Sequence, residues 1–357
     1  MVTRYVNSML RDSLLKELPS SVTAIGRTPK LFSLNADYGY IIGVELGSLH
    51  MAKIGIFKFD GSFISNSSLC YVPEWDAKET IDNVIDAVEG ELAASSIDRG
   101  RILHIVIGNP GVVNPDTGSI ELAARSAKWS KLPLNQIFQQ HFGVQVKIVN
   151  DVNLSALGEK ERGEGHGYQN FILVRQTVGL KAGIILKERL YQGESHAAGE
   201  IGHSILSVVE DGEMIRKNAE SLLSLSAICN QIASKLHDHP NDIFYSITGG
   251  NPKNVTVENI VKALGKPSYV NDCIGEAGEM LGYVLVNTVV VLDIALIILS
   301  GEITKFNNYY IKGIRKVLSE HLPHPPTVLI SSLGDDAALH GAFAIGQESV
   351  LANIPNQ

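Results

Sequence analysis

The residues best suited to do chemistry lie in two short clusters. Residues 144–149 alternate in the manner of a strand and end at Asn150-Asp151, and a later glycine-rich segment carries Glu200 and His203. Open α/β sheets place ligand-binding groups at the carboxyl ends of their strands, which is where Asp151 is expected. Two carboxylates, an amide and an imidazole suit a polyhydroxylated ligand such as a sugar, because each hydroxyl group both donates and accepts hydrogen bonds. A helix cap for Asp151 and a packed structural role for His203 stay open as alternatives for either residue alone.

Alternating strand-like and helical patterns supply the frame for these clusters. Apolar residues at three- and four-residue steps predict helices over 2–15 and 79–92. Turn-forming residues between 19 and 29 predict a linker. Strands are predicted at 30–34, 40–45, 52–57, 102–107, 144–149 and 327–332, with a further set between 171 and 193. Further helices are predicted at about 153–163, at 221–235, from 273 onward and at 337–345.

The order of these elements predicts two similar α/β lobes, because strands followed by alternating strands and helices occur twice. A length of 357 residues also exceeds what one hydrophobic core usually supports. The predicted divisions are a short N-terminal segment with its linker (1–35), an N-terminal lobe (36–150) and a C-terminal lobe (151–357). The last helix is expected to return to the N-terminal lobe.

Composition indicates a folded cytoplasmic protein. The chain is 45% hydrophobic and 19% charged, and its three cysteines (Cys70, Cys229 and Cys273) lie far apart, which favours reduced thiols over a disulfide framework. No export pattern opens the sequence. The net charge of −8 divides into +3 for residues 1–30 and −11 for the remainder, so the acidic body repels polyanions while the N-terminus could contact one.

An apolar run from Met280 to Ser300 is long enough to cross a bilayer. Asn287 and Asp293 interrupt it, and the apolar residues on either side of Asp293 are typical of a buried helix that runs into a buried strand. We therefore expect a core segment rather than a membrane span.

Several short motifs occur in a specific order along nearly the whole chain. They are Gly26-Arg27-Thr28-Pro29, Gly108-Asn109-Pro110-Gly111, Asn150-Asp151, Gly199-Glu200-Ile201-Gly202-His203 and Leu333-Gly334-Asp335-Asp336-Ala337. Together they resemble the ROK family, which comprises repressors, open reading frames and sugar kinases. The resemblance implies a two-lobed α/β fold of the actin-like ATPase (ribonuclease H-like) type, preceded here by a short N-terminal helical remnant.

The resemblance also implies a sugar site. By likeness to the family, the sugar hydroxyls are contacted by Asn109, Asn150, Asp151, Glu200 and His203. In the kinases the residue that matches Asp151 is also the general base that takes the proton of the phosphorylated hydroxyl, a role that contributes about 10²–10⁴-fold. Ser126 departs from the pattern, because the family usually has an asparagine there.

The nucleotide half of the family pattern is eroded. Leu49 stands where the first phosphate hairpin of the kinases has a threonine, and Val178 and Lys181 replace a threonine and a glycine of the second phosphate loop. Glu302 puts a carboxylate where the adenosine-side motif has a glycine. Losing several charge-assisted contacts of roughly 1.5–3 kcal/mol each would push ATP binding out of a useful range. Weak or undetectable sugar phosphorylation is therefore expected, and the alternative is ordinary drift in a working kinase.

The family's structural zinc joins the residue matching His203 to three cysteines. Alignment places Met214, Arg216 and Ser221 at those cysteine positions, and a thiolate zinc site cannot be built from them. We expect no metal and no cofactor, with ATP and Mg²⁺ required only if the kinase alternative holds.

The N-terminus resembles part of a winged helix-turn-helix. Residues 2–10 are similar to a recognition helix, whose polar residues near its start (Thr3, Arg4 and Asn7) would face base edges in a major groove, and 14–18 resemble the approach to a wing. A plain amphipathic helix packed on the body is the alternative. The two helices that normally precede a recognition helix are absent, so we expect either a chain that starts late or a regulator that has lost its DNA-binding fold.

Three functions remain open at this level. The first is a sugar-responsive repressor that binds a free sugar between its lobes and, in a full-length form, operator DNA as a homodimer or higher oligomer. The second is a cytosolic ATP-dependent sugar kinase. The third is a sugar-binding protein that acts through a protein partner. No membrane association is expected for any of them.

Overall fold

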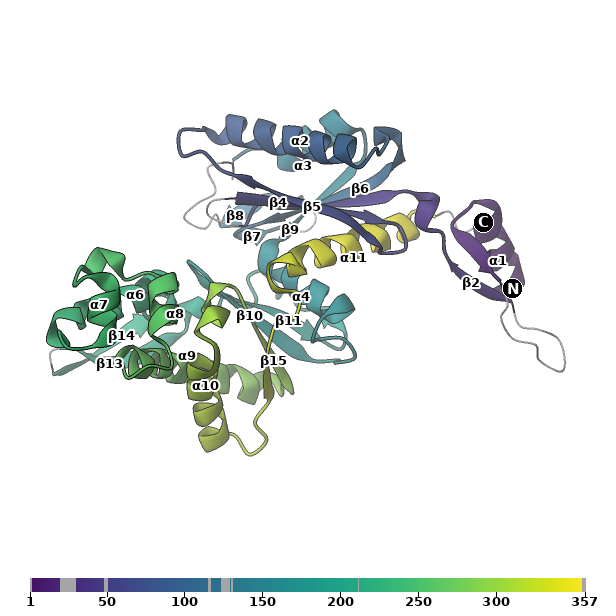
Figure 1. Ribbon diagram of the computed structural model, residues 1–357. Coiled ribbons are helices and arrows are strands. Elements are labelled where there is room, and N and C mark those ends of the chain that lie inside the picture. The colour runs from purple at the N-terminus through teal and green to yellow at the C-terminus, as the bar shows by residue number, and fades with distance from the viewer. Residues whose placement is uncertain are drawn as a thin grey trace. The chain divides into compact units, whose positions relative to one another are not determined.

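The chain folds into two compact units, each built on a five-stranded mixed sheet (Figure 1). The computed structural model describes residues 2–19, 30–47, 51–114, 117–122, 129, 131–210 and 212–354. Unit 1 comprises Met1–Asp151 and Ala338–Gln357, and unit 2 comprises Val152–Ala337.

The sheet of unit 1 has the order β5-β4-β3-β6-β9. Three neighbouring strands, β3, β6 and β9, are parallel, while β4 and β5 are antiparallel additions at one side. The bounds are β3 Tyr40–Glu45, β4 Met51–Lys58, β5 Phe63–Cys70, β6 Ile102–Asn109 and β9 Gln145–Asn150, with a small pair of β7 Val112–Val113 and β8 Ile120–Leu122. The predicted strands at 40–45, 52–57, 102–107 and 144–149 are confirmed, and β5 was not predicted.

Helices cover both faces of this sheet (Figure 1). On one face, α2 (Ala77–Ala94) and α3 (Leu134–Phe142) pack onto strand residues that belong to one buried cluster. On the other face lies α11 (Ala337–Ala352). A Cβ added at Gly43 or Gly55 would lie 3.0 Å from an Ala342 or Leu339 side-chain atom, so glycines in β3 and β4 let α11 approach closely.

Unit 2 repeats the same strand arrangement. Its sheet has the order β12-β11-β10-β15-β16, in which β10, β15 and β16 are parallel and β11 and β12 are antiparallel. The strands are β10 Phe171–Gln176, β11 Leu180–Leu186, β12 Arg189–Leu190, β15 Leu296–Ser300 and β16 Thr327–Ile330, with a separate hairpin of β13 Ile205–Glu210 and β14 Glu213–Asn218. The helices are α4 Asp151–Arg162, α5 Ala219–Leu223, α6 Leu225–Ser234, α7 Ile243–Thr248, α8 Val257–Ala263, α9 Val270–Leu292 and α10 Asn307–His321. The repeated arrangement confirms the prediction of two similar α/β lobes.

Helix α9 contains most of the apolar run noted in the sequence. By length and composition alone it could cross a membrane, but 44% of its apolar window is buried within the unit. It packs against α10 so closely that a Cβ added at Gly313 would lie 2.8 Å from the Glu279 backbone nitrogen. Asp293, in the left-handed region at φ 52°, ends the helix, and β15 follows with all five residues buried. The predicted helix running into a buried strand is confirmed, but the helix is only partly buried, because Val290 and Val291 near its end are 67% and 80% exposed.

A small N-terminal arm consists of α1 (Val2–Arg11) and the hairpin of β1 (Leu15–Leu18) with β2 (Leu31–Leu34). The predicted helix over 2–15 was too long, because Ser13 adopts a positive φ of 59° and the chain then enters β1. The predicted linker falls between the hairpin strands, and its residues 20–29, including Gly26-Arg27-Thr28-Pro29, lie outside the described residues.

The arm is docked on unit 1 by a buried leucine. Leu14 is 2% exposed and belongs to a cluster with Ile41, Phe57 and Phe59 of the sheet region and Phe343 of α11. Met9 of α1 and Leu34 of β2 pack against the same cluster. The arm is therefore part of the hydrophobic core of unit 1 rather than a free appendage.

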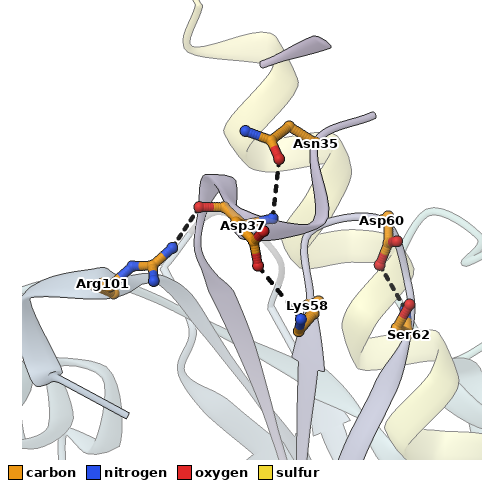
Figure 2. A network of polar contacts seen from close by, with 6 residues as sticks. All are labelled: Asn35, Asp37, Lys58, Asp60, Ser62 and Arg101. Atoms are coloured by element: carbon orange, nitrogen blue, oxygen red, sulfur yellow. Dashed lines mark hydrogen bonds and ion pairs between the residues drawn. The ribbon is translucent and has the colours of Figure 1, made fainter. Parts of the chain in front are cut away.

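Polar contacts fix the point where the arm joins the sheet (Figure 2). Asn35 donates to the Ser13 carbonyl oxygen at 2.8 Å and accepts from the Asp37 N–H at 3.2 Å. Asp37 pairs with Lys58 of β4 at 3.3 Å, and its carbonyl oxygen accepts from the Arg101 guanidinium. These contacts tie the segment between the end of β2 and the start of β3 to the body of the unit.

The docking of the arm predicts a large effect for Leu14→Ala. Deleting a buried leucine side chain leaves a cavity, so the free energy of unfolding should fall by about 2–5 kcal/mol. Leu18→Ala is the matched control, because Leu18 lies in the strand that follows Leu14 but is 37% exposed, and its effect should stay within about 0.5 kcal/mol. Urea unfolding of both variants measures the difference, and equal effects would contradict the docking.

Candidate functional site

The carboxyl ends of three parallel strands bring polar residues together at one edge of the unit 1 sheet. Glu45, the last residue of β3, is in register with Gly108, and Asn109 at the end of β6 is in register with Asn150 at the end of β9. Asp151 follows immediately as the first residue of α4. This is the edge at which open α/β sheets bind ligands, as the sequence pattern predicts.

Asn109 is held by its neighbours at this edge. Its side chain is fully buried, its Oδ1 accepts from the Trp129 indole N–H at 2.8 Å, and its Nδ2 donates to the Pro110 carbonyl oxygen at 2.7 Å. Tyr71 meets Trp129 edge-on with ring centroids 5.4 Å apart. Burial raises the pKa of Tyr71 well above its ordinary value, with the nearby Glu45 carboxylate adding to the rise, so this phenol stays protonated. The aromatic pair thus fixes one orientation of the Asn109 amide.

Asp151 is 6% exposed and lies against Gly47, which follows β3. A Cβ added at Gly47 would lie 3.0 Å from the Asp151 Cγ, so the carboxylate occupies space that any larger residue would fill. Asn150 donates from Nδ2 to the Gly111 carbonyl oxygen at 2.8 Å. Asp151 also stands in the first turn of α4, and the start of a helix favours a negatively charged group.

In unit 2, two glycines allow the segment that carries Glu200 and His203 to lie against strand β11. The Gly199 carbonyl oxygen accepts from the Ala182 N–H at 2.7 Å, and Gly199 has a positive φ of 90°. A Cβ added at Gly202 would lie 2.6 Å from the Leu180 carbonyl oxygen. The Leu180 N–H in turn donates to Glu220 of α5 at 3.2 Å. His203 is exposed at the end of the short helix Ile201–His203.

Lys181 forms an ion pair with Glu200. Its Nζ lies 2.8 Å from Glu200 Oε1, and the two side chains are 19% and 25% exposed. The lysine that replaces a glycine of the family's phosphate loop is therefore bonded to a carboxylate that the sequence assigns to sugar recognition. Of the other departures in the nucleotide half, Glu302 pairs with Lys305 at 2.9 Å, and Leu49 lies outside the described residues.

The remaining sequence predictions fall at separate places. Met214 and Arg216 lie on β14 and Ser221 on α5, and within the described part of the chain no three His, Cys, Asp or Glu side chains gather as a metal site would require. Arg4 and Asn7 are exposed on α1, whereas the side chain of Thr3 and the whole of Ser126 are not among the described parts.

Sequence reasoning missed the residues that position the predicted ones. Tyr71 and Glu220 carry no motif of their own, and Gly47 belongs to the segment matched to the first phosphate hairpin, not to the predicted sugar site. The contacts of these three residues join positions 25 to 104 residues apart, so only the folded chain shows them. The partnership of Trp129 with Asn109 was likewise not predicted. The sequence signal for that pair is an asparagine at the end of a predicted buried strand followed by a tryptophan 20 positions later.

A profile of the ROK family matches residues 41–349. The chain belongs to the ROK family. Its sequence is 26% identical over 351 residues to a xylose repressor of Caldicellulosiruptor bescii, covering 96% of this chain and 87% of the relative. It is also 26% identical over 327 residues to a glucokinase of Streptomyces coelicolor, covering 87% of this chain and 98% of the relative.

The fold of this ROK protein matches that of a solved family member. The crystal structure of a ROK family transcriptional regulator, described as a homolog of the E. coli MLC protein, superimposes with a TM-score of 0.80 at 21% identity, covering 98% of this chain and 88% of that one. The predicted two-lobed actin-like ATPase fold is confirmed. Repressors and glucokinases of the family are both similar to this chain, so the choice between them depends on the site residues.

The geometry around Gly199 predicts that Gly199→Ala is destabilising. The substitution places a Cβ against the Ala182 carbonyl oxygen at a positive φ, and strained backbone of this kind costs about 1–3 kcal/mol. Gly90→Ala is the control, since Gly90 lies in α2 with open space around it, and alanine there should stabilise the helix by up to about 1 kcal/mol. Thermal unfolding distinguishes them, and a Gly199→Ala variant as stable as the parent would contradict the described packing.

Proposed function

We propose that this ROK protein is a cytoplasmic, sugar-responsive transcriptional repressor that binds a free sugar and, in a full-length form, acts on operator DNA as a homodimer. The sugar is bound by the hydroxyl-bonding groups predicted from the sequence, which are Asn109, Asn150, Asp151, Glu200 and His203. Carboxylates accept from hydroxyl groups, and amide and imidazole nitrogens donate to them.

The observation that carries the proposal is the Lys181–Glu200 ion pair. In a kinase this strand end belongs to a glycine-rich phosphate loop, where backbone N–H groups must approach the nucleotide. Here a side chain of four methylene groups stands on the strand, and its charge is engaged by Glu200 at 2.8 Å rather than by phosphate. The carboxylate of Glu302, bonded to Lys305, adds a negative charge on the adenosine side.

The extent of the similarity supports a repressor as well. The likeness to the xylose repressor covers 96% of this chain, whereas the likeness to the glucokinase covers 87%. The family profile itself begins at residue 41, so the docked arm lies outside the region that kinases and repressors share. An arm with a helix and a two-stranded wing fits a DNA-binding function.

The second candidate is an ATP-dependent sugar kinase. It is favoured by the glucokinase relative, which this chain covers over 98% of its length, and by the buried Asp151 at the start of α4. In that case Asp151 acts as the general base, and ATP with Mg²⁺ is the phosphate donor.

Sugar binding predicts a ligand-dependent rise in stability that requires Asp151. With D-xylose and D-glucose as first probes, a binding sugar at a hundredfold excess over its dissociation constant should add about 2.7 kcal/mol. Asp151→Asn should abolish the thermal shift while the variant stays folded, because the amide cannot replace the charge-assisted acceptor. Asp293→Asn, at an exposed helix end, is the control and should respond like the parent. An Asp151→Asn variant that responds fully would place the sugar elsewhere.

DNA binding by this chain is expected to be weak and to depend on Arg4. The exposed Arg4 and Asn7 share one face of α1, while Met9 packs into unit 1, and the body carries a net charge of −11. Few phosphate contacts leave an affinity near the non-specific range of roughly 10⁻⁴–10⁻⁶ M at physiological salt. Fluorescence anisotropy at low salt should show weaker binding for Arg4→Ala than for Arg189→Ala, an exposed arginine of unit 2. Tight, sequence-specific binding would overturn this expectation.

A further inference from the structure

The Lys181–Glu200 pair is held by backbone on both sides. Lys181 lies in β11, and the chain that carries Glu200 is fixed to the same strand by the bond from Ala182 to Gly199 and by the close approach of Gly202 to Leu180. Most surface ion pairs contribute little because two long side chains must be ordered to form them. In this pair the two backbones lie at a set distance, so less ordering is needed.

A second cation lies beside Lys181 in the sheet. Arg175 of β10 lies directly opposite Lys181 in the strand register, so the two cations share one face of the sheet. Like charges directly opposite each other destabilise a strand pair. Arg175 also donates to Ser155 at 3.3 Å, and Glu220 accepts from the Leu180 N–H beside it. Glu200 therefore offsets a local excess of positive charge as well as pairing with Lys181.

We propose that Lys181 and Glu200 act together as a binding site for a vicinal diol of the sugar, with Lys181 in direct contact with the ligand. The carboxylate only accepts hydrogen bonds and the ammonium group only donates them. Two adjacent gauche hydroxyl groups place their oxygens at about hydrogen-bond separation, which is the separation of Lys181 Nζ and Glu200 Oε1. One hydroxyl donates to Glu200, and its neighbour accepts from Lys181. The ligand class is thus a neutral sugar with two adjacent free hydroxyl groups, and the inference rests on the proposed sugar binding.

This pairing gives the lysine a function that a phosphate-loop glycine cannot have. A hydrogen bond to a charged group contributes more binding free energy than one between neutral partners. Two such bonds, to the Lys181 Nζ and the Glu200 Oε1, depend on both the position and the spacing of the two hydroxyl groups. Lys181 is therefore a specificity residue for the sugar, and its replacement changes which hydroxyls matter.

The test measures sugar affinity by calorimetry on the 357-residue chain. D-xylose and D-glucose are the probes, followed by the monodeoxy analogues of whichever sugar binds. Lys181→Met keeps the length of the side chain without its charge and should weaken binding about 10- to 100-fold, the range expected for one charged hydrogen bond. Lys181→Arg should retain most of the affinity, and Lys312→Met, at an exposed position of α10, should bind like the parent.

The deoxy analogues separate direct contact from mere positioning of Glu200. The parent should bind one of the deoxy analogues about 10- to 100-fold more weakly than the complete sugar. The Lys181→Met variant should bind that analogue and the complete sugar with equal affinity. Uniform weakening of all analogues by Lys181→Met would overturn the direct contact.

Undiminished binding by Lys181→Met, with binding lost in Glu200→Gln, would overturn the inference and leave the proposed function standing. Failure of the parent to bind either sugar would instead overturn the proposed function itself. Circular dichroism of each variant confirms folding, and Lys181→Ala, which also removes the charge, carries the test if Lys181→Met does not fold.

Discussion

The arrangement of unit 1 depends on a nearly buried carboxylate at the end of a parallel strand. Asp151 is 6% exposed, and a buried charge is tolerated only where polar partners and a favourable field compensate for lost water. The start of α4 supplies such a field, and Gly47 leaves the space that the carboxylate needs. Asn109 is locked beside it by Trp129. The edge formed by β3, β6 and β9 is therefore organised around one acidic group.

Unit 2 has the same sheet arrangement, but its strand β11 carries a charged side chain where the family's phosphate loop has a glycine. A phosphate loop needs backbone N–H groups and small residues, whereas here Lys181 extends from β11 and meets Glu200. The change does not disturb the fold, because Lys181 is a strand residue whose side chain leaves the sheet hydrogen bonds intact. A family fold that serves sugar kinases can in this way keep its hydroxyl-bonding residues while its nucleotide contacts are replaced.

The sequence predicts those elements whose pattern is local and strong. The stripe of apolar residues in α2 and the apolar run from α9 into β15 are of this kind. In both, the spacing of apolar residues along a short stretch of sequence indicates which side chains are buried. Strand β5 was missed because it is a largely polar strand at the edge of the sheet, formed through its pairing with β4. Its sequence is Phe63-Ile64-Ser65-Asn66-Ser67-Ser68-Leu69-Cys70. The hairpin β13–β14 was missed for a related reason, since its exposed Ile205, Val209 and Met214 fit neither a core strand nor a helix. The site residues followed from family resemblance, but the contacts of Asp151 with Gly47 and of Lys181 with Glu200 join distant positions, and no local pattern contains them.

The most direct test of a sugar-binding rather than sugar-phosphorylating protein is calorimetric titration of the sugar with and without MgATP. The same instrument records the heat of binding and any continuing heat of turnover. A sugar-binding repressor should give one saturable binding heat, unchanged by MgATP, with the signal returning to baseline after each injection. Sustained heat flow in the presence of MgATP, at rates within the typical enzyme range of about 1–10³ s⁻¹, would contradict it and identify a working kinase.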